Sequence, residues 1–530
     1  MAFACTTDLN GEFMEAGVAN LSEFLVETAA ARPDRPALRL GNHTTTYADL
    51  DARSARAAAL LRAEGVRPGD RIALMLPNVP EFVVLYYGAL RAGAIVVPLN
   101  PLLKERETAY HLTDSGAVLL FEWHQAPGEG AQGAVTAGVR RVAVEPAAFA
   151  ALLAEHAPST EVAGTADDDV AVLLYTSGTT GKPKGAALTH GGLRHNTEVM
   201  KAHVTRMTPD DVVVGCLPLF HIFGQICTMS VAVRSGASLT LVPRFDPQTV
   251  LDAIAADRAT VFGGVPTMYA ALLQHPADAD VTSLRMCVSG GASLPVEVLH
   301  GFEKRFGCAV LEGFGMSETS PVVTFNHLDR PRKAGSIGTP IQDVEVRLLD
   351  DKGQNVGAGE IGELAVRGPN VMKGYWNRPE ETAAAIPDGW LRTGDLARRD
   401  EDGYFYIVDR KKDMIIRGGY NVYPREIEEV LHEHPAVALA AVVGVPHQQL
   451  GEEVAAAVVL RPEARATPEE LRQYVKDRVA AYKYPRVVRL MDALPMGPSG
   501  KILKREISAR AASGQLATSG AGTGDGEQAH

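Results

Sequence analysis

A loop that combines glycine, hydroxyl and lysine residues is the strongest candidate for chemistry in this chain. Its sequence, YTSGTTGKPKG, occupies residues 175–185 and directly follows the apolar run at residues 170–174. Glycines let the backbone turn tightly and present N–H groups to an anion, while hydroxyl and ammonium groups add further donors. The pattern predicts a polyphosphate-binding loop made by Thr176, Ser177, Gly178, Thr179, Thr180, Gly181, Lys182 and Lys184. It is not a Walker sequence, because Pro183 stands where that motif requires Ser or Thr.

A second candidate places hard oxygen ligands behind two glycines. The motif consists of Gly313, Phe314, Gly315, Met316, Ser317 and Glu318. Glycine permits close approach of the backbone to a ligand, and the Ser317 and Glu318 oxygens are of the kind that Mg²⁺ takes alongside substrate phosphates. Ser followed by Glu is also an ordinary way to begin a helix, so this motif alone leaves both interpretations open.

Three further polar residues are candidates for ligand binding or catalysis because of the sequences around them. Asp395 ends WLRTGD, and a carboxylate there can accept both hydroxyls of a ribose, although Asp beside Gly is as often only a turn residue. Lys501 follows the loop GPSG, which should project a compact positive charge suited to stabilising a transition state. His221 lies in the apolar run LPLFHIFG, where a satisfied core histidine is the commoner role.

Other patterns do not support a ligand site. The sequence GEGAQG at residues 128–133 matches a dinucleotide fingerprint but leads into no clear helix, so we interpret it as a surface loop. His432 and His434 are two residues apart and would face different directions on a helix, which favours solvated side chains over a metal pair. The five cysteines form no C-x-x-C pair, which indicates a reduced compartment without structural zinc.

The elements around these motifs alternate between short apolar runs and amphipathic stretches. RIALML from residue 71, PEFVVLYYGALRAG from residue 80 and AIVVPL from residue 94 predict strand, helix and strand. This spacing favours parallel sheets covered by helices. After about residue 335, runs such as VEVRLLD and GYFYIVD, separated by Gly and Asp, predict a small antiparallel sheet or barrel.

The fold class is therefore α/β, with a large N-terminal domain of stacked α/β sheets and a small mobile α+β C-terminal domain. We place the N-terminal domain at residues 1–409 and the C-terminal domain at residues 410–512, because DRKKD has the composition of a linker. Thr46 with Asp49, and Thr467 with Glu470, predict capping boxes that begin two helices. The Gly-, Ser- and Ala-rich tail, residues 513–530, is predicted to be disordered.

Composition limits the classes of partner. The chain has 530 residues, and 52 Lys and Arg against 64 Asp and Glu give a net charge of −12. This acidic balance argues against a chain-wide grip on nucleic acid or anionic lipid, so anionic ligands must be held locally. The longest apolar stretch, at residues 436–445, is about half of the roughly 20 residues that a membrane span needs. Because no signal peptide is apparent, we expect a cytoplasmic location.

Taken together, the motifs resemble the adenylate-forming acyl-CoA synthetase superfamily over residues 20–510. They follow the order of that family: TSGTTGKPKG, PLFHIFG at 218–224, SGGASLP at 289–295, GFGMSE, WLRTGD, VDRKKDMIIRGGYNVYPREIE at 408–428 and PSGKILKRE at 498–506. The resemblance implies ATP and coenzyme A as co-substrates and Mg²⁺ as cofactor. It implies that Lys501 is the adenylation lysine, that Glu318 is the magnesium ligand and that Thr176 also acts in catalysis.

The resemblance also assigns the remaining candidates. Arg410 joins Asp395 at the nucleotide, and Gly290, Gly291 and Ala292 pack against adenine. The acyl pocket is implied to consist of His221, Phe223, Gly224, Val265 and Gly313. Lys412 is implied to be the hinge between two orientations of the small domain, and Gly418 and Gly419 to line the coenzyme A site after rotation.

The implied reaction converts a carboxylic acid, ATP and coenzyme A into acyl-CoA, AMP and pyrophosphate through an acyl adenylate. The motifs look most like bacterial medium- or long-chain fatty acyl-CoA synthetases. The pocket stretches HIFGQICTM and VFGGVPTMYA contain no Arg or Lys, which disfavours a dicarboxylic acid, and Gly224, Gly263 and Gly264 leave space for an elongated chain. An aromatic acid, a ligase that loads a phosphopantetheine carrier protein, and a nucleotide-binding regulator remain alternatives.

Overall fold

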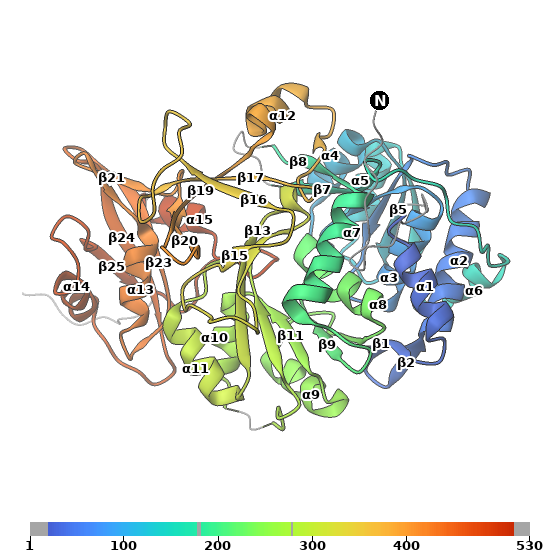
Figure 1. Ribbon diagram of the computed structural model, residues 1–530, viewed down its shortest axis with the longest axis horizontal. Coiled ribbons are helices and arrows are strands. Elements are labelled where there is room, and N and C mark those ends of the chain that lie inside the picture. The colour runs from blue at the N-terminus through green and yellow to red at the C-terminus, as the bar shows by residue number, and fades with distance from the viewer. Residues whose placement is uncertain (1–19, 177–181, 277–278, 513–530) are drawn as a thin grey trace, which may run out of the picture.

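The computed structural model describes residues 20–176, 182–276 and 279–512. Ser177, Gly178, Thr179, Thr180 and Gly181 of the glycine loop lie outside the described residues, as does the tail predicted to be disordered. Four sheets organise the described chain, two of them large and two small. Figure 1 shows the two large sheets and their helices in blue to yellow, and the last sheet at the far end of the molecule in orange to red.

The first large sheet has seven strands, most of them parallel. In spatial order they are β18 (Gly374–Tyr375), β8 (Lys184–Thr189), β7 (Val170–Thr176), β4 (Ile95–Pro98), β3 (Arg71–Met75), β5 (Ala117–Trp123) and β6 (Arg140–Val144). Its neighbouring helices are α2 (Tyr47–Ala63), α3 (Pro80–Arg91), α4 (Glu105–Ser115), α5 (Glu129–Ala137) and α6 (Pro146–Ala154). Parallel strands need cover on both faces, which explains why these runs are almost continuously apolar. The capping box of Thr46 and Asp49 begins α2, as predicted.

The second large sheet has nine strands and provides the floor of the candidate site. In spatial order they are β15 (Thr339–Pro340), β14 (Val322–Phe325), β13 (Ala309–Gly315), β12 (Met286–Ser289), β11 (Val261–Gly264), β9 (Val212–Gly215), β10 (Ser238–Leu241), β1 (Pro36–Leu40) and β2 (His43–Thr46). The helical segments of this region are α1 (Glu23–Ala31), α7 (His190–Val199), η1 (Met200–Thr205), η2 (Gly224–Ser230), α8 (Val231–Ser235), α9 (Pro247–Asp257), α10 (Pro266–Gln274), α11 (Val296–Phe306) and η3 (Ser317–Thr319).

A four-stranded antiparallel sheet connects the large sheets to the C-terminal part. Its strands are β16 (Glu345–Leu349), β17 (Gly362–Arg367), β19 (Leu391–Arg399) and β20 (Phe405–Arg410), with α12 (Pro379–Ala385) and η4 (Pro387–Gly389) between them. The predicted antiparallel character of this region is confirmed.

The C-terminal part has its own sheet and hydrophobic core. The sheet contains β22 (Tyr420–Val422), β21 (Ile415–Arg417), β24 (Gly451–Leu460), β23 (Val437–His447) and β25 (Val487–Leu490), with α13 (Pro424–His432), α14 (Pro468–Lys476) and α15 (Lys504–Ala512). Ile427 and Leu431 of α13 pack with Val442 and Val454 in a cluster separate from the main core. The α/β class with a separate small α+β domain is confirmed, and the capping box of Thr467 and Glu470 begins α14.

Two interpretations of the sequence are wrong. Residues 128–133 are not a surface loop, because α5 begins at Glu129. A Cβ atom at Gly133 would lie 2.7 Å from the Thr108 Cβ, so this glycine permits close packing of α5 on α4. His432 is not solvated: its side chain packs at the end of α13 and is only 7% exposed. Within the described part of the chain, no helix has the length and apolar character to cross a membrane.

Candidate active site

The glycine loop is held by the hairpin of β7 and β8. Thr176, the last residue of β7, pairs with Lys184, the first residue of β8, so the loop between them starts and ends at one point. Lys184 is buried, and its Nζ lies 5.1 Å from the ring centroid of Tyr375. Lys182 is exposed. The hairpin therefore presents one fixed and one solvated lysine beside the loop.

Glu318 is fixed by two hydroxyl donors from different parts of the chain. Its Oε1 accepts hydrogen bonds from the Thr176 Oγ1 at 3.2 Å and from the Tyr375 hydroxyl at 3.0 Å. Burial, and then the neighbouring Glu318 charge, raise the pKa of Tyr375, so this hydroxyl stays a donor. Gly315 precedes the glutamate where a Cβ would collide with the Pro321 carbonyl, which explains the need for glycine there.

The donor set at Glu318 fits Mg²⁺ bound together with phosphate oxygens. Among the described residues, no three His, Cys, Asp or Glu side chains gather as a closed metal site. Magnesium does not need such a cage, because it is commonly held by one or two carboxylates plus substrate phosphates and water. A single buried carboxylate next to the Thr176 hydroxyl matches that pattern.

Asp395 and Arg410 face each other on adjacent strands. They are register partners in β19 and β20, and the Arg410 Nε donates to the Asp395 Oδ1 at 3.1 Å. Asp395 is only 5% exposed, and burial raises its pKa while Arg410 and Lys501 oppose that shift. The Arg410 side chain bonds only the first carboxylate oxygen, which leaves the second as an acceptor for a ligand hydroxyl.

Lys501 enters this group from the C-terminal domain. Gly500, with φ of 76°, turns the chain, and the Thr267 hydroxyl donates to its carbonyl oxygen at 2.7 Å. Burial and then the Arg410 charge lower the pKa of Lys501 to about 8, while Asp395 and Glu318 act in the opposite direction. A Cβ at Gly291 would lie 3.1 Å from the Lys501 Cε, so the lysine lies against the glycine pair of SGGASLP.

The residues predicted to line an acyl pocket converge beside Lys501. A Cβ at Gly290 would lie 3.2 Å from the Phe223 Cζ, and one at Gly291 would lie 3.5 Å from the Val265 Cγ1. Burial, and then Lys501, lower the pKa of His221 to about 3, so this side chain is a neutral wall. Ala292 is an exposed residue of the same loop.

The glycines at 224, 263 and 264 do not leave open space, contrary to our expectation. A Cβ at Gly224 would lie 2.9 Å from the Leu217 carbonyl oxygen, and one at Gly263 would lie 3.0 Å from the Thr228 Cγ2. A Cβ at Gly264 would lie 2.8 Å from the Phe262 ring. These glycines admit neighbouring protein atoms, and so does Gly313, where a Cβ would collide with the Phe325 ring.

Lys412, Gly418 and Gly419 lie away from these contacts. Lys412 is in the turn that follows β20, between Arg410 and Met414, whose N–H donates to the Arg410 carbonyl at 3.1 Å. Gly418 and Gly419 turn the chain between β21 and β22 with φ of 57° and 84°, and the Gly418 N–H donates to the Leu450 carbonyl at 2.8 Å. In this arrangement the Lys501 loop, and not the glycine turn, reaches the site.

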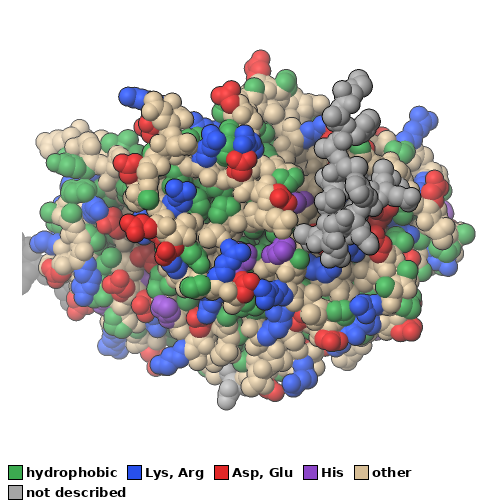
Figure 2. Space-filling model, viewed as in Figure 1, with side chains coloured by type: hydrophobic (Ala, Val, Ile, Leu, Met, Phe, Trp, Pro, Cys, Tyr) green, Lys and Arg blue, Asp and Glu red, His purple; other side chains and the backbone are tan. Residues whose placement is uncertain are grey.

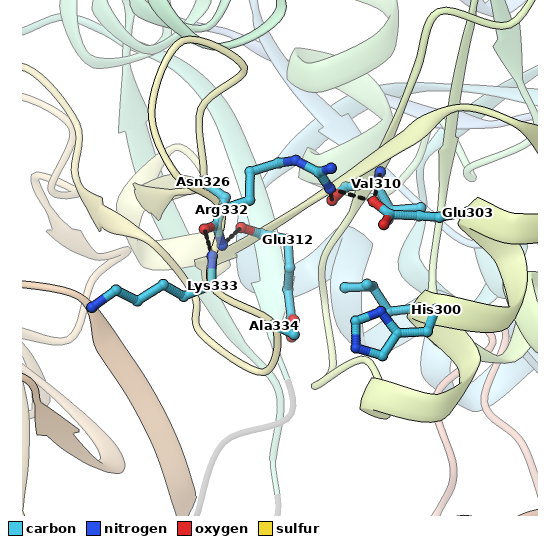
Figure 3. A pocket seen from close by; sticks show the side chains of 9 residues that line it. His300, Glu303, Val310, Glu312, Asn326, Arg332, Lys333 and Ala334 are labelled. Atoms are coloured by element: carbon cyan, nitrogen blue, oxygen red, sulfur yellow. Dashed lines mark hydrogen bonds and ion pairs between the residues drawn. The ribbon is translucent and has the colours of Figure 1, made fainter.

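Sequence reasoning missed Tyr375, Thr267 and Glu312. The first two are isolated in sequence and act only through contacts made across the fold. Glu312 precedes GFGMSE and lines a cavity of about 160 Å³ together with Asn326 and Lys333 (Figure 3). Its Oε1 accepts from the Leu294 N–H at 2.9 Å, and burial raises its pKa to about 7. The apolar neighbours of Glu312 in LEGFG did not indicate that its side chain is buried beside a cavity.

The contacts bring together the β7–β8 hairpin, a buried carboxylate, an Asp–Arg pair and a lysine from the C-terminal part. This combination defines a class of enzyme, because it suits nucleotide-dependent activation of an acid. The AMP-binding enzyme family matches residues 25–376, and the AMP-binding enzyme C-terminal domain matches residues 426–501. The chain belongs to the adenylate-forming acyl-CoA ligase superfamily and is an acid–thiol ligase.

Individual relatives carry several substrate names. A long-chain-fatty-acid–CoA ligase of Bacillus subtilis is 38% identical over 92% of this chain and 94% of its own length. A feruloyl-CoA synthase of an Amycolatopsis species is 42% identical over 92% of this chain and 99% of its own length. ATP-bound MatB from Rhodopseudomonas palustris is 34% identical, with a TM-score of 0.87 over 93% of this chain and 99% of that structure. ATP is accordingly a co-substrate, and the reaction passes through an adenylate.

Proposed function

We propose that this enzyme is a fatty acid–CoA ligase that acts on medium- or long-chain acids. The supporting observation is the character of the acyl pocket, where Phe223 and Val265 meet the glycine pair and His221 is neutral. A second carboxylate would have no cationic partner in the stretches that follow His221 and Val261, and burying it unpaired would be costly. An apolar monocarboxylic acid therefore suits the pocket best.

The site residues divide the first half-reaction among them. The hairpin loop and Lys184 hold the phosphates, Asp395 accepts the ribose hydroxyls, and Gly290 with Gly291 leaves room for adenine. Glu318, oriented by Thr176, would hold Mg²⁺, which supplies charge neutralisation on the phosphate oxygens when bound. Lys501 places its ammonium group where negative charge develops as the substrate carboxylate attacks the α-phosphate.

The second half-reaction requires the small domain to turn. We place its boundary between residues 409 and 410 and its pivot at Lys412. Lys501 occupies the site in the present arrangement, so coenzyme A can be covered by Gly418 and Gly419 only after Lys501 withdraws. Two half-reactions thus use two closed states that share one hinge.

An alternative acid and an alternative thiol acceptor are both compatible with the same reaction through an acyl adenylate. The feruloyl-CoA synthase relative supports an aromatic acid as the alternative substrate. A phosphopantetheine arm on a carrier protein in place of free coenzyme A is the alternative for the acceptor.

Pyrophosphate release tests these proposals directly. We would measure it with Mg·ATP and acids from acetate to palmitate, together with benzoate, cinnamate and ferulate, in the presence and absence of coenzyme A. Release that rises with chain length and becomes multiple-turnover with coenzyme A supports the fatty acid assignment. A preference for ferulate or cinnamate contradicts it, and release that stalls after one turnover despite coenzyme A contradicts the free thiol as acceptor.

A further inference from the structure

A crevice of about 270 Å³ opens where α10 and α11 face α13 and β23. Figure 1 shows these four elements side by side, with the two helices in yellow-green and the C-terminal elements in orange. Its lining includes Leu273, Glu297, Val298, His432, Val437 and Arg461. None of them belongs to the nucleotide, acid or coenzyme A sites described above.

His432 is the buried polar group of this crevice. It lies in the last turn of α13, is 7% exposed, and its ring makes no hydrogen bond to any of the described residues. Burial lowers its pKa to about 4, so the imidazole is neutral and carries one N–H donor. The ring nitrogens are not closed off from solvent, so this N–H opens onto the crevice and can donate to an acceptor on a ligand.

Arg461 is an exposed cation at the rim of the crevice, attached to it by one backbone contact. Its Nε donates to the Val437 carbonyl oxygen at 3.0 Å, which fixes the guanidinium against the end of β23. No carboxylate within the described ranges lies within ion-pair distance of it, so its two terminal nitrogens remain as donors. An arginine fork of this kind matches the geometry of a carboxylate.

The other walls limit the ligand to one charge and a modest size. Leu273, Val298 and Val437 supply apolar surface, and Glu297 in the first turn of α11 would repel a second negative charge. A cavity of about 150 Å³ can hold benzene, so about 270 Å³ accommodates on the order of ten non-hydrogen atoms.

We propose that this crevice is a second binding site, which takes a small monocarboxylate with an apolar body. The carboxylate binds the Arg461 guanidinium and the His432 N–H, and the apolar body lies against Leu273 and Val298. Because α10 and α11 form one wall and α13 and β23 the other, the site exists only while the two domains hold this arrangement.

A contact next to the crevice shows how the two walls are joined. Glu429 lies one turn before His432 on α13, and its Oε2 accepts a hydrogen bond from the Val296 N–H at 3.3 Å. A ligand in the crevice adds to this contact and stabilises the arrangement in which Lys501 is at the active site. Binding to one of two states shifts their ratio by 1 + [L]/Kd, which is about elevenfold at ten times Kd.

Binding is tested first, with cyclohexanecarboxylate as the probe. The full-length enzyme is loaded with a non-hydrolysable acyl-sulfamoyl adenosine so that its acid site is filled, and the affinity for the probe is measured by calorimetry. Arg461→Gln and His432→Phe should each weaken binding at least tenfold. Arg465→Gln, an exposed arginine nearby, is the matched control and should bind like the wild type.

The outcomes separate clearly. Equal affinity in all four proteins, or no saturable binding by the wild type at about 20 mM probe, would overturn the site. Thermal unfolding of each variant, together with an unchanged rate of pyrophosphate release, shows that a loss of affinity does not come from misfolding.

The regulatory effect rests on the proposed division into two half-reactions. At ten times Kd, the probe should slow thioester formation from a supplied acyl adenylate about tenfold and leave adenylation unchanged. The slowing should disappear in Arg461→Gln. If the probe binds through Arg461 but slows neither half-reaction, the site stands and the coupling to domain rotation is wrong.

Discussion

The buried ammonium group of Lys501 gives adenylation a defined dependence on pH. Burial lowers the pKa of this lysine to about 8, and in the role that we propose for it the charged form stabilises the transition state. The protonated fraction is then about 0.9 at pH 7 and about 0.1 at pH 9. Activity that depends on the ammonium is therefore retained below pH 8 and lost above it, with a decrease of about tenfold between these two values.

A substituted cation that does not titrate tests whether Lys501 causes this loss of adenylation above pH 8. Lys501→Arg keeps a cation at every accessible pH, so its rate of adenylation should be lower overall but nearly flat from pH 7 to 9. The measurement is the single-turnover rate of pyrophosphate release without coenzyme A at subsaturating substrate, because this rate reports groups of the free enzyme. An inflection near pH 8 that persists in Lys501→Arg would show that another group titrates.

The lowered pKa of Lys501 also implies a free-energy cost for docking the small domain on the large one. A decrease in pKa from 10.5 to about 8 corresponds to roughly 3 kcal/mol of disfavoured charge. Because the pKa in the folded state is depressed, this cost is fully present below pH 8 and fades as the pH rises toward 10.5. Anionic oxygens of ATP and the acid offset it, so nucleotide should favour the docked arrangement.

Four further predictions concern other residues. Lys501→Ala should slow adenylation on the order of 10² to 10³ fold while thioester formation from a supplied acyl adenylate survives, and equal loss of both would contradict the division of labour. Lys412→Pro should trap the pre-rotation arrangement, because proline removes a backbone N–H and fixes φ. The rate of thioester formation should therefore fall, and a normal rate would mean that the hinge lies elsewhere. Glu429→Ala should reduce adenylation by roughly 5 to 30 fold through the loss of about 1 to 2 kcal/mol of docking, whereas Glu426→Ala, whose partner Lys483 is in the same domain, should leave it unchanged. Gly130→Ala should lower the free energy of unfolding by about 1 to 3 kcal/mol, measured by denaturant titration, because a Cβ would lie 2.7 Å from the Met75 Sδ.

The sequence was informative where a local pattern decides the structure. The alternation of apolar runs predicted the large sheets, and the Ser/Thr capping signals located the starts of α2 and α14. Residues 128–133 were misassigned because glycine lowers helix propensity, whereas here the absence of a side chain is what lets α5 pack on α4. Tertiary packing overrode the local preference, and one sequence alone does not show that packing.

The candidate site was predictable to a different extent. Loop chemistry drew attention to Glu318, Asp395 and Lys501, which the fold brings together from three separate regions. Tyr375 and Thr267 had no signal, since a lone hydroxyl becomes meaningful only when a distant chain segment supplies its partner. The burial of His432 likewise depends on a neighbouring domain, which no helical periodicity within residues 424–432 could show.

The proposed acyl pocket and Lys501 meet in space but come from different parts of the chain, which has a consequence for how such an enzyme can change. The pocket walls come from segments at residues 221–223, 265 and 290–313, all in the nine-stranded sheet region, whereas the lysine belongs to a part with its own hydrophobic cluster. The walls that we propose to select the acid and the lysine that we propose to activate it are therefore encoded by different stretches of chain. Recombination or design can exchange the first for another set of walls and keep the second, so new substrates are accessible without reinventing the reaction.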